Sequence, residues 1–127
     1  MTPMRYPQLL IYEGDGRVAA QLRSLAEEQR WSLREPRQLA PCLALLERGG
    51  PNVLLIKMGR DLERELTLLE RVRWLRPETA TVVVGDTDHP GLAALAWDLG
   101  ASCVLLPRSI ATGELAEIVL GLMGLNG

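Results

Sequence analysis

The chain has 127 residues, of which 47% are hydrophobic and 24% charged, a balance typical of one soluble globular domain. Fourteen basic and sixteen acidic residues give a formal net charge of −2, which argues against direct nucleic-acid binding by this domain. No apolar run approaches the roughly 18 residues of a membrane span. Residues 1–8 lack the apolar stretch of a signal peptide, so we expect a cytoplasmic protein with no membrane contact.

Five short apolar runs alternate with segments that carry apolar residues at helical spacing. The runs predict strands at 8–12, 31–33, 53–56, 81–84 and 103–106. The other segments predict helices at about 15–26, 39–46, 62–75, 90–99 and 115–123. Pro41 fits only the first turn of the second helix, where proline costs no intrahelical bond, and Gly100 is placed to cap the fourth.

This alternation predicts an α/β fold, because parallel strands need helical crossovers to join them. We expect a doubly wound sheet and a single domain that fills residues 1–127, with its core at about 8–123. In such a sheet ligands usually bind at the carboxyl ends of the strands, where the strand order reverses.

Three segments carry a family resemblance: LLIYEGD at 9–15, PNVLLIK at 51–57 and WDLGASCVLLP at 97–107. Their order and spacing resemble those of a response-regulator receiver domain, the CheY-like fold. The likeness covers about residues 8–123. It implies a flavodoxin-like three-layer sandwich in which five parallel strands take the order 2-1-3-4-5 and are covered by five helices.

The resemblance also places the residues of a receiver's phosphorylation pocket, and most of them differ here. Receivers hold Mg²⁺ with an acidic pair after the first strand, where this chain has Glu13 and Gly14, followed by Asp15. The phosphoacceptor aspartate at the end of the third strand falls on Lys57. An ammonium group cannot form an acyl phosphate, and it repels the Mg²⁺ that phosphoryl transfer needs.

The later strands depart from the family in the same way. The Thr or Ser that ends the fourth strand in receivers falls on Gly85, and the phosphate-contacting lysine after the fifth falls on Pro107, beside Arg108. The aromatic switch position is Cys103 or Val104. The chain therefore looks like a pseudo-receiver, and we expect no enzyme activity, no cofactor and no metal.

Lys57 has two interpretations. It is expected to form an ion pair with Glu13, with Asp15 as a second candidate partner, which would replace metal and phosphate and lock one conformation. Alternatively its stem packs over the strand end while the ammonium group reaches water.

The remaining polar residues near this edge have structural interpretations. Asp15 and Asp88 are placed to cap helices, so a cation site that combines them with Glu13 and Asp86 is disfavoured. His89 is interpreted as a solvated residue that precedes a helix. The mixed charges of 60–76 are interpreted as a solvated helix face.

The two cysteines have a structural interpretation as well. The family's strand order places Cys103 on an edge strand and Cys42 near the opposite edge, too far apart to bridge. We expect two buried, reduced thiols.

The helix at 92–99 carries one charge in eight residues, although packing on a sheet buries only one stripe of a helix. Ala93, Ala96 and Leu99 are plausible core positions, and Trp97 either points outward or folds over the sheet edge. Receivers use the face of the fourth helix, fifth strand and fifth helix for dimers and partner docking. The candidate interface residues are Leu92, Leu95, Trp97, Val104 and Leu106.

These observations favour a phosphorylation-independent signalling domain of two-component or phosphorelay type. It would act as a protein-interaction or homodimerisation module, either alone or as a fragment of a longer regulator. The alternative is a small-ligand-binding flavodoxin-like domain that uses the cleft at Glu13, Lys57 and Gly85. An enzyme comes third, because no nucleophile–base pair and no metal site can be recognised.

Overall fold

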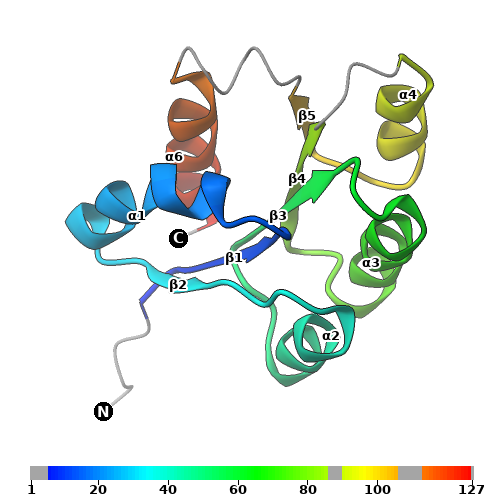
Figure 1. The fold of residues 1–127 in the computed structure, drawn as a ribbon. Coiled ribbons are helices and arrows are strands. Elements are labelled where there is room, and N and C mark those ends of the chain that lie inside the picture. The colour runs from blue at the N-terminus through cyan, green and yellow to red at the C-terminus, as the bar shows by residue number, and fades with distance from the viewer. Residues whose placement is uncertain (1–5, 86–89, 106–112, 127) are drawn as a thin grey trace.

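The computed structural model describes residues 6–85, 90–105 and 113–126, which form a parallel sheet with helices on both faces (Figure 1). The sheet has five strands in the order β2-β1-β3-β4-β5. The strands are β1 (Gln8–Tyr12), β2 (Ser32–Arg34), β3 (Val53–Met58), β4 (Ala80–Gly85) and β5 (Cys103–Leu105). The predicted doubly wound α/β architecture is confirmed, and so is the strand order that the resemblance implied.

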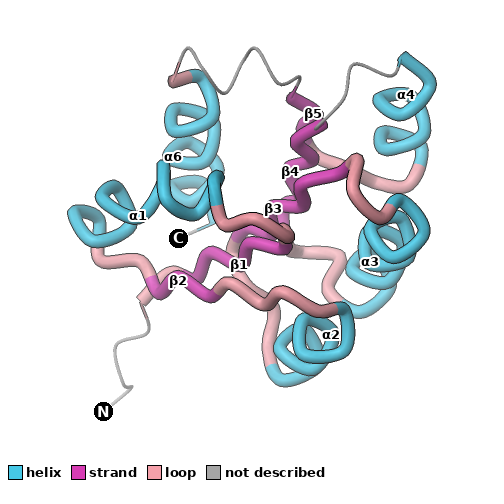
Figure 2. Tube along the Cα trace, in the orientation of Figure 1, coloured by secondary structure: helices cyan, strands magenta, loops and turns pink. Residues whose placement is uncertain are grey.

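The helices divide between the two faces of the sheet (Figure 2). They are α1 (Arg17–Gln29), α2 (Leu39–Arg48), α3 (Leu62–Leu75), α4 (Pro90–Asp98) and α6 (Glu114–Asn126). Helices α1 and α6 cover one face, and α2, α3 and α4 cover the other. None of these helices is both long and apolar enough to cross a membrane.

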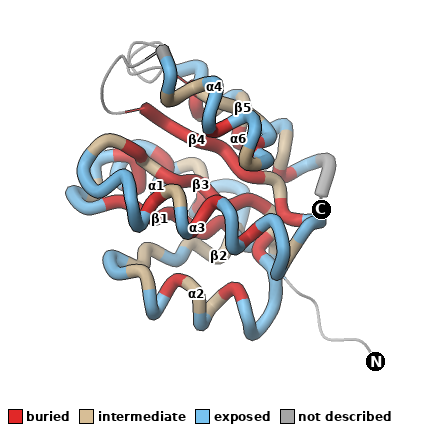
Figure 3. Tube along the Cα trace, turned by 90° about the vertical axis from the view of Figure 1, so that its right-hand side faces the viewer, coloured by how far each residue is buried: buried red, intermediate tan, exposed pale blue. Residues whose placement is uncertain are grey.

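Strand β3 lies at the centre of the sheet, between β1 and β4. Leu55 faces the α1 and α6 side, whereas Leu54 and Ile56 face the α2, α3 and α4 side. All three side chains are fully buried, and buried positions run through the middle strands (Figure 3). A strand covered on both faces needs a continuous apolar run, which explains why this segment was predicted so clearly; it extends two residues further than expected, to Met58.

Both edge strands, β2 and β5, have only three residues. Short edges expose few unpaired backbone groups, which limits edge-to-edge aggregation. Strand β2 begins at Ser32, one residue later than predicted. The predicted end of the fifth strand, Leu106, lies outside the described residues.

The two cysteines are unpaired, as predicted. Cys42, on α2, is buried in the core. Cys103 was also expected to be buried but is only partly so, because it lies on a short edge strand, and it packs on the opposite face of the sheet. Burial raises the pKa of the Cys42 thiol to about 12. That thiol therefore stays protonated and unreactive at neutral pH.

The predicted cap of α4 is confirmed and also joins two helices. Gly100 has φ 105°, a conformation that favours glycine, and its N–H donates to the Trp97 carbonyl at 3.1 Å. The Ala101 N–H donates to the Ala96 carbonyl at 3.0 Å, which completes a Schellman motif. Arg73 of α3 donates to the Asp98 carbonyl at 3.3 Å, so the ends of α3 and α4 are tied together.

One part of the predicted solvated helix face is wrong. Glu65 of α3 is only 4% exposed, because it lies on the stripe that faces the core. Its two carboxylate oxygens accept the N–H groups of Gly59 at 2.9 Å and Asp61 at 3.1 Å. Burial raises the pKa of Glu65 above its ordinary value, although these hydrogen bonds oppose the rise. Glu65 therefore fixes the loop that follows β3.

Candidate functional site

The candidate site lies at the carboxyl ends of β1, β3 and β4. Glu13 directly follows β1, and Lys57 is the penultimate residue of β3, paired in register with Val84 of β4. Gly85 is buried at the end of β4, opposite Met58. The sheet therefore places Glu13, Lys57 and Gly85 at the same edge, as predicted.

Glu13 is engaged by the helix that follows it. Its side chain is 5% exposed, and its two carboxylate oxygens accept the N–H groups of Val18 at 3.0 Å and Ala19 at 2.8 Å. The first N–H groups of a helix have no intrahelical partner and form the positive end of its dipole. The Glu13 carboxylate accepts two of these N–H groups, and its negative charge interacts favourably with the helix dipole. It is thus part of the α1 framework, and a metal ion would have to compete with these backbone hydrogen bonds.

Lys57 forms an ion pair with Asp15. Its Nζ lies 2.9 Å from Oδ2 and 3.2 Å from Oδ1 of Asp15. The Lys57 side chain is only 12% exposed, so its ammonium group does not extend into water as the alternative interpretation held. The predicted ion pair is present, and the partner is Asp15, the second candidate. Glu13, the first candidate, directs its carboxylate oxygens to the α1 amides.

The ion pair lowers the pKa of Asp15. The hydrogen bond from Lys57, supported by one from the Arg17 N–H at 3.2 Å, lowers the pKa of Asp15 from 3.8 to about 2. Asp15 is therefore a carboxylate at every physiological pH. It does not cap α1 as predicted, because Gly16 occupies the cap position with φ 74° and the helix begins at Arg17.

Two arginines surround the same loop. Arg37 donates to the Gly14 carbonyl at 3.1 Å, and a methyl group on Gly16 would come within 2.8 Å of its Nη2. A methyl group on Gly14 would come within 2.7 Å of Nη1 of Arg60. Together with Lys57, three cationic side chains therefore border the loop 13–16.

Sequence reasoning missed Arg37 and Arg60. Both belong to loops that follow strands, Arg37 after β2 and Arg60 after β3. In a parallel sheet all such loops lie at the carboxyl ends of the strands. The predicted topology could therefore have indicated that Arg37 and Arg60 lie near Lys57.

No metal-binding constellation is found at this edge among the residues that the structure describes. Within residues 6–85, 90–105 and 113–126, no group of three His, Cys, Asp or Glu side chains is placed to hold a metal ion. The predicted pocket residues Pro107 and Arg108, and the loop residues Asp86, Asp88 and His89, lie outside the described residues.

The candidate interface is divided by exposure. Leu95 and Trp97 of α4 are 42% and 52% exposed, so Trp97 does not fold over the sheet edge. Ala96, between them, is fully buried. Leu92 and Val104 are partly buried and pack against the core. Leu95 and Trp97 are two positions apart on the helix, one on each side of the core-facing Ala96, so they are exposed on opposite flanks of α4.

The structures to which this chain is similar include receiver domains of response regulators. No protein-family model and no curated protein matches its sequence. A CheY-like response regulator receiver domain from Methanospirillum hungatei JF-1 superposes with a TM-score of 0.79 at 18% identity, covering 97% of this chain and 100% of that one. The fold is that of a receiver domain. A response regulator from Thermotoga maritima gives a TM-score of 0.78 at 16% identity, covering 94% and 99% of the two chains.

A third receiver structure is an activated dimer. The beryllofluoride-activated NtrC4 receiver domain dimer matches with a TM-score of 0.76 at 13% identity, covering 94% of this chain and 98% of that one. At identities this low, the superpositions establish the fold alone. The chemistry of the site has to be argued from the residues present.

The Asp15–Lys57 ion pair predicts a specific dependence of stability on pH. Because the pKa of Asp15 is lowered in the folded chain, its contribution is complete above pH 3.8 and is lost as the pH falls toward about 2. Asp15→Asn should therefore be less stable than the wild type at neutral pH, by about 0.5–1 kcal/mol because solvent screens the pair. Urea unfolding at a series of pH values should show this difference shrink below pH 4.

The control for this prediction removes the partner. In a Lys57→Met background, Asp15→Asn should cause a smaller loss at neutral pH and a weaker dependence on pH. A stability difference that is the same at all pH values, or the same in both backgrounds, would contradict the assigned ion pair.

Proposed function

We propose that this chain is a degenerate receiver domain of two-component-type signalling that works without phosphoryl transfer and acts through protein–protein contacts. One observation carries the proposal: Lys57, at the end of β3 where the family resemblance implies a phosphoacceptor aspartate, is ion-paired with Asp15 at 2.9 Å. The likeness to response regulator receivers supports a role in regulation.

The chemistry of the pocket supports phosphorylation independence. Phosphoryl transfer to a receiver needs a carboxylate nucleophile and a Mg²⁺ ion that neutralises the developing charge. Lys57 supplies an ammonium group in place of the nucleophile. Arg37 and Arg60 add positive charge around the loop that would hold the metal, and both oxygens of Glu13 are already hydrogen-bonded. For these reasons we propose neither an enzyme activity nor a metal cofactor.

The same contacts support a fixed conformation of this edge. The Asp15–Lys57 pair joins the loop after β1 to the end of β3, and Glu13 joins that loop to α1. Internal charges thus make the connections that a metal ion and a phosphoryl group would otherwise make. We infer that the domain holds one state of this loop without a chemical signal.

The surface of α4 supports a role in protein contacts. Trp97 of α4 is 52% exposed, and an exposed tryptophan is a good anchor for an interface because it buries a large area when covered. We propose that a second copy of this chain, or another protein, covers this surface.

The first prediction concerns phosphorylation. After incubation with acetyl phosphate and Mg²⁺, the intact mass of the chain should not change, because no carboxylate occupies the phosphoacceptor position. A sample in which EDTA replaces Mg²⁺ is the control, and it should give the same mass spectrum. A Mg²⁺-dependent gain of one phosphoryl group would contradict the proposal.

The second prediction concerns self-association. Light scattering after size exclusion should find a dimer that Trp97→Asp dissociates, because a carboxylate at the centre of an apolar interface is costly to bury. Trp74→Asp is the matched control: Trp74 is 77% exposed on α3, and its substitution should leave the dimer intact. A wild-type monomer at all concentrations, or equal effects of both variants, would contradict self-association through α4.

A further inference from the structure

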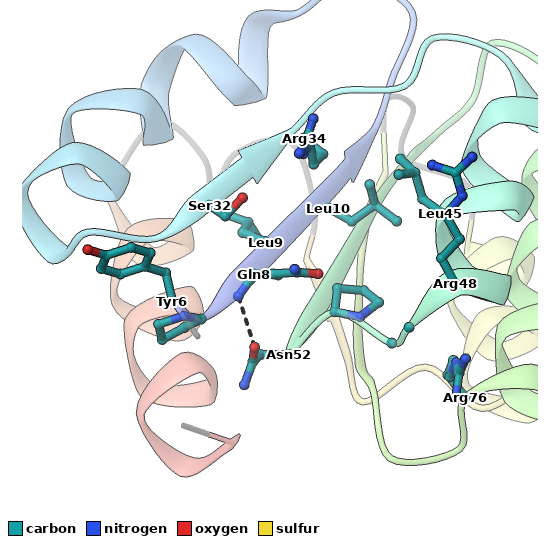
Figure 4. A pocket seen from close by; sticks show the side chains of 14 residues that line it. Tyr6, Gln8, Leu9, Leu10, Ser32, Arg34, Leu45, Arg48, Asn52 and Arg76 are labelled. Atoms are coloured by element: carbon teal, nitrogen blue, oxygen red, sulfur yellow. Dashed lines mark hydrogen bonds between the residues drawn. The ribbon is translucent and has the colours of Figure 1, made fainter. Parts of the chain in front are cut away.

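A second hollow lies at the other end of the sheet, away from Lys57. Its volume is about 970 Å³, within the usual range for small-molecule sites. It opens at the amino ends of β1 and β2, next to the carboxyl end of α2 (Figure 4). Buried Leu9 and Leu10 contribute to its lining, so the hollow borders the apolar core.

The lining of this hollow is strongly cationic. It includes Arg34, Arg48 and Arg76, and none of its lining residues within the described part of the chain is an aspartate or glutamate. Arg76 is already in use, because it donates to the carbonyls of Leu46 at 2.8 Å and Glu47 at 3.0 Å and so caps α2. Its contribution is therefore mainly structural.

Arg34 and Arg48 have donors to spare. Neither makes a side-chain hydrogen bond or ion pair with the part of the chain that the structure describes. The neighbour of Arg34, Glu35, is paired with Arg23 at 3.0 Å. Glu78, beside Gly50, places a carboxylate near Arg76. The unused positive charge is thus concentrated on Arg34 and Arg48.

The aromatic ring of Tyr6 and the guanidinium group of Arg48 lie at opposite ends of the hollow. Figure 4 shows Tyr6 at one end and Arg48 at the other, with Gln8 and Leu10 between them. Tyr6 is 54% exposed, so one face of its ring is available. A smaller hollow of about 400 Å³ shares Arg34, Leu45 and Arg48, and it also includes Glu35, whose carboxylate is paired with Arg23.

We propose that this hollow binds a nucleoside phosphate, with its phosphates on Arg34 and Arg48 and its base against Tyr6. Guanidinium groups donate paired hydrogen bonds to phosphate oxygens and remain charged at every relevant pH. An aromatic ring stacks on any base and is tolerant of its identity. The site is independent of Lys57, so it stands whether or not the domain is phosphorylated.

Other anions match the hollow less well. Inorganic phosphate is too small to reach Tyr6 and leaves the apolar lining uncovered. An acidic peptide needs donors spread along an outer surface, whereas these arginines gather around a concave site. A ligand with a phosphate at one end and a flat ring at the other uses both ends of the hollow.

The test is calorimetric titration of the 127-residue chain with ADP, pyrophosphate and adenosine at low salt. ADP should bind, and Arg34→Gln and Arg48→Gln should each weaken binding about tenfold, the loss of one charge-assisted contact. Tyr6→Ala should weaken ADP binding severalfold and leave pyrophosphate binding unchanged. Arg71→Gln, an exposed helical arginine outside the hollow, is the matched control and should bind ADP like the wild type.

Three results would overturn the proposal. The first is no binding of ADP. The second is pyrophosphate binding as tight as ADP binding, which would mean that the base makes no contact. The third is an equal loss in Arg48→Gln and Arg71→Gln, which would mean attraction by the overall charge and no defined site. Circular dichroism of each variant shows whether the fold is intact.

Discussion

The ammonium group of Lys57, held at the end of the central strand, is the charge around which the carboxyl edge of the sheet is organised. Strand β3 is buried on both faces, so its last residues cannot move away from the edge. A cation fixed there needs a carboxylate, and Asp15 supplies one at 2.9 Å. Together with the hydrogen bonds of Glu13 to α1 and of Arg37 to Gly14, this contact holds the loop after β1.

Two buried glutamates provide the remaining support. Glu13 accepts two N–H groups at the start of α1, and Glu65 accepts two from the loop after β3. Buried carboxylates are costly unless they are hydrogen-bonded, and each of these has at least two partners. The loops on both sides of Lys57 are thus held by hydrogen bonds to the protein's own side chains and backbone.

The fold was largely predictable from the sequence, whereas the pairing of charges was not. The apolar runs in the sequence predicted the buried strands, and Gly100 predicted the end of α4. The sequence could not show which carboxylate pairs with Lys57, because Glu13 and Asp15 are only two residues apart. The conformation of the loop decides that Glu13 accepts the α1 amides and that Asp15 pairs with Lys57. Glu65 was missed for a related reason: a glutamate among many charges resembles a surface residue until its helix is packed.

We propose that the chain's own charges occupy this end of the sheet and leave no place for Mg²⁺. The most direct test is a Mg²⁺ titration followed by the backbone amide resonances of Gly14, Gly16 and Gly59, with sodium chloride at matched ionic strength as the reference. We expect no saturable shift in the wild type, and a saturable shift once Lys57→Asp restores an acidic site. A saturable, EDTA-reversible shift in the wild type would contradict the account.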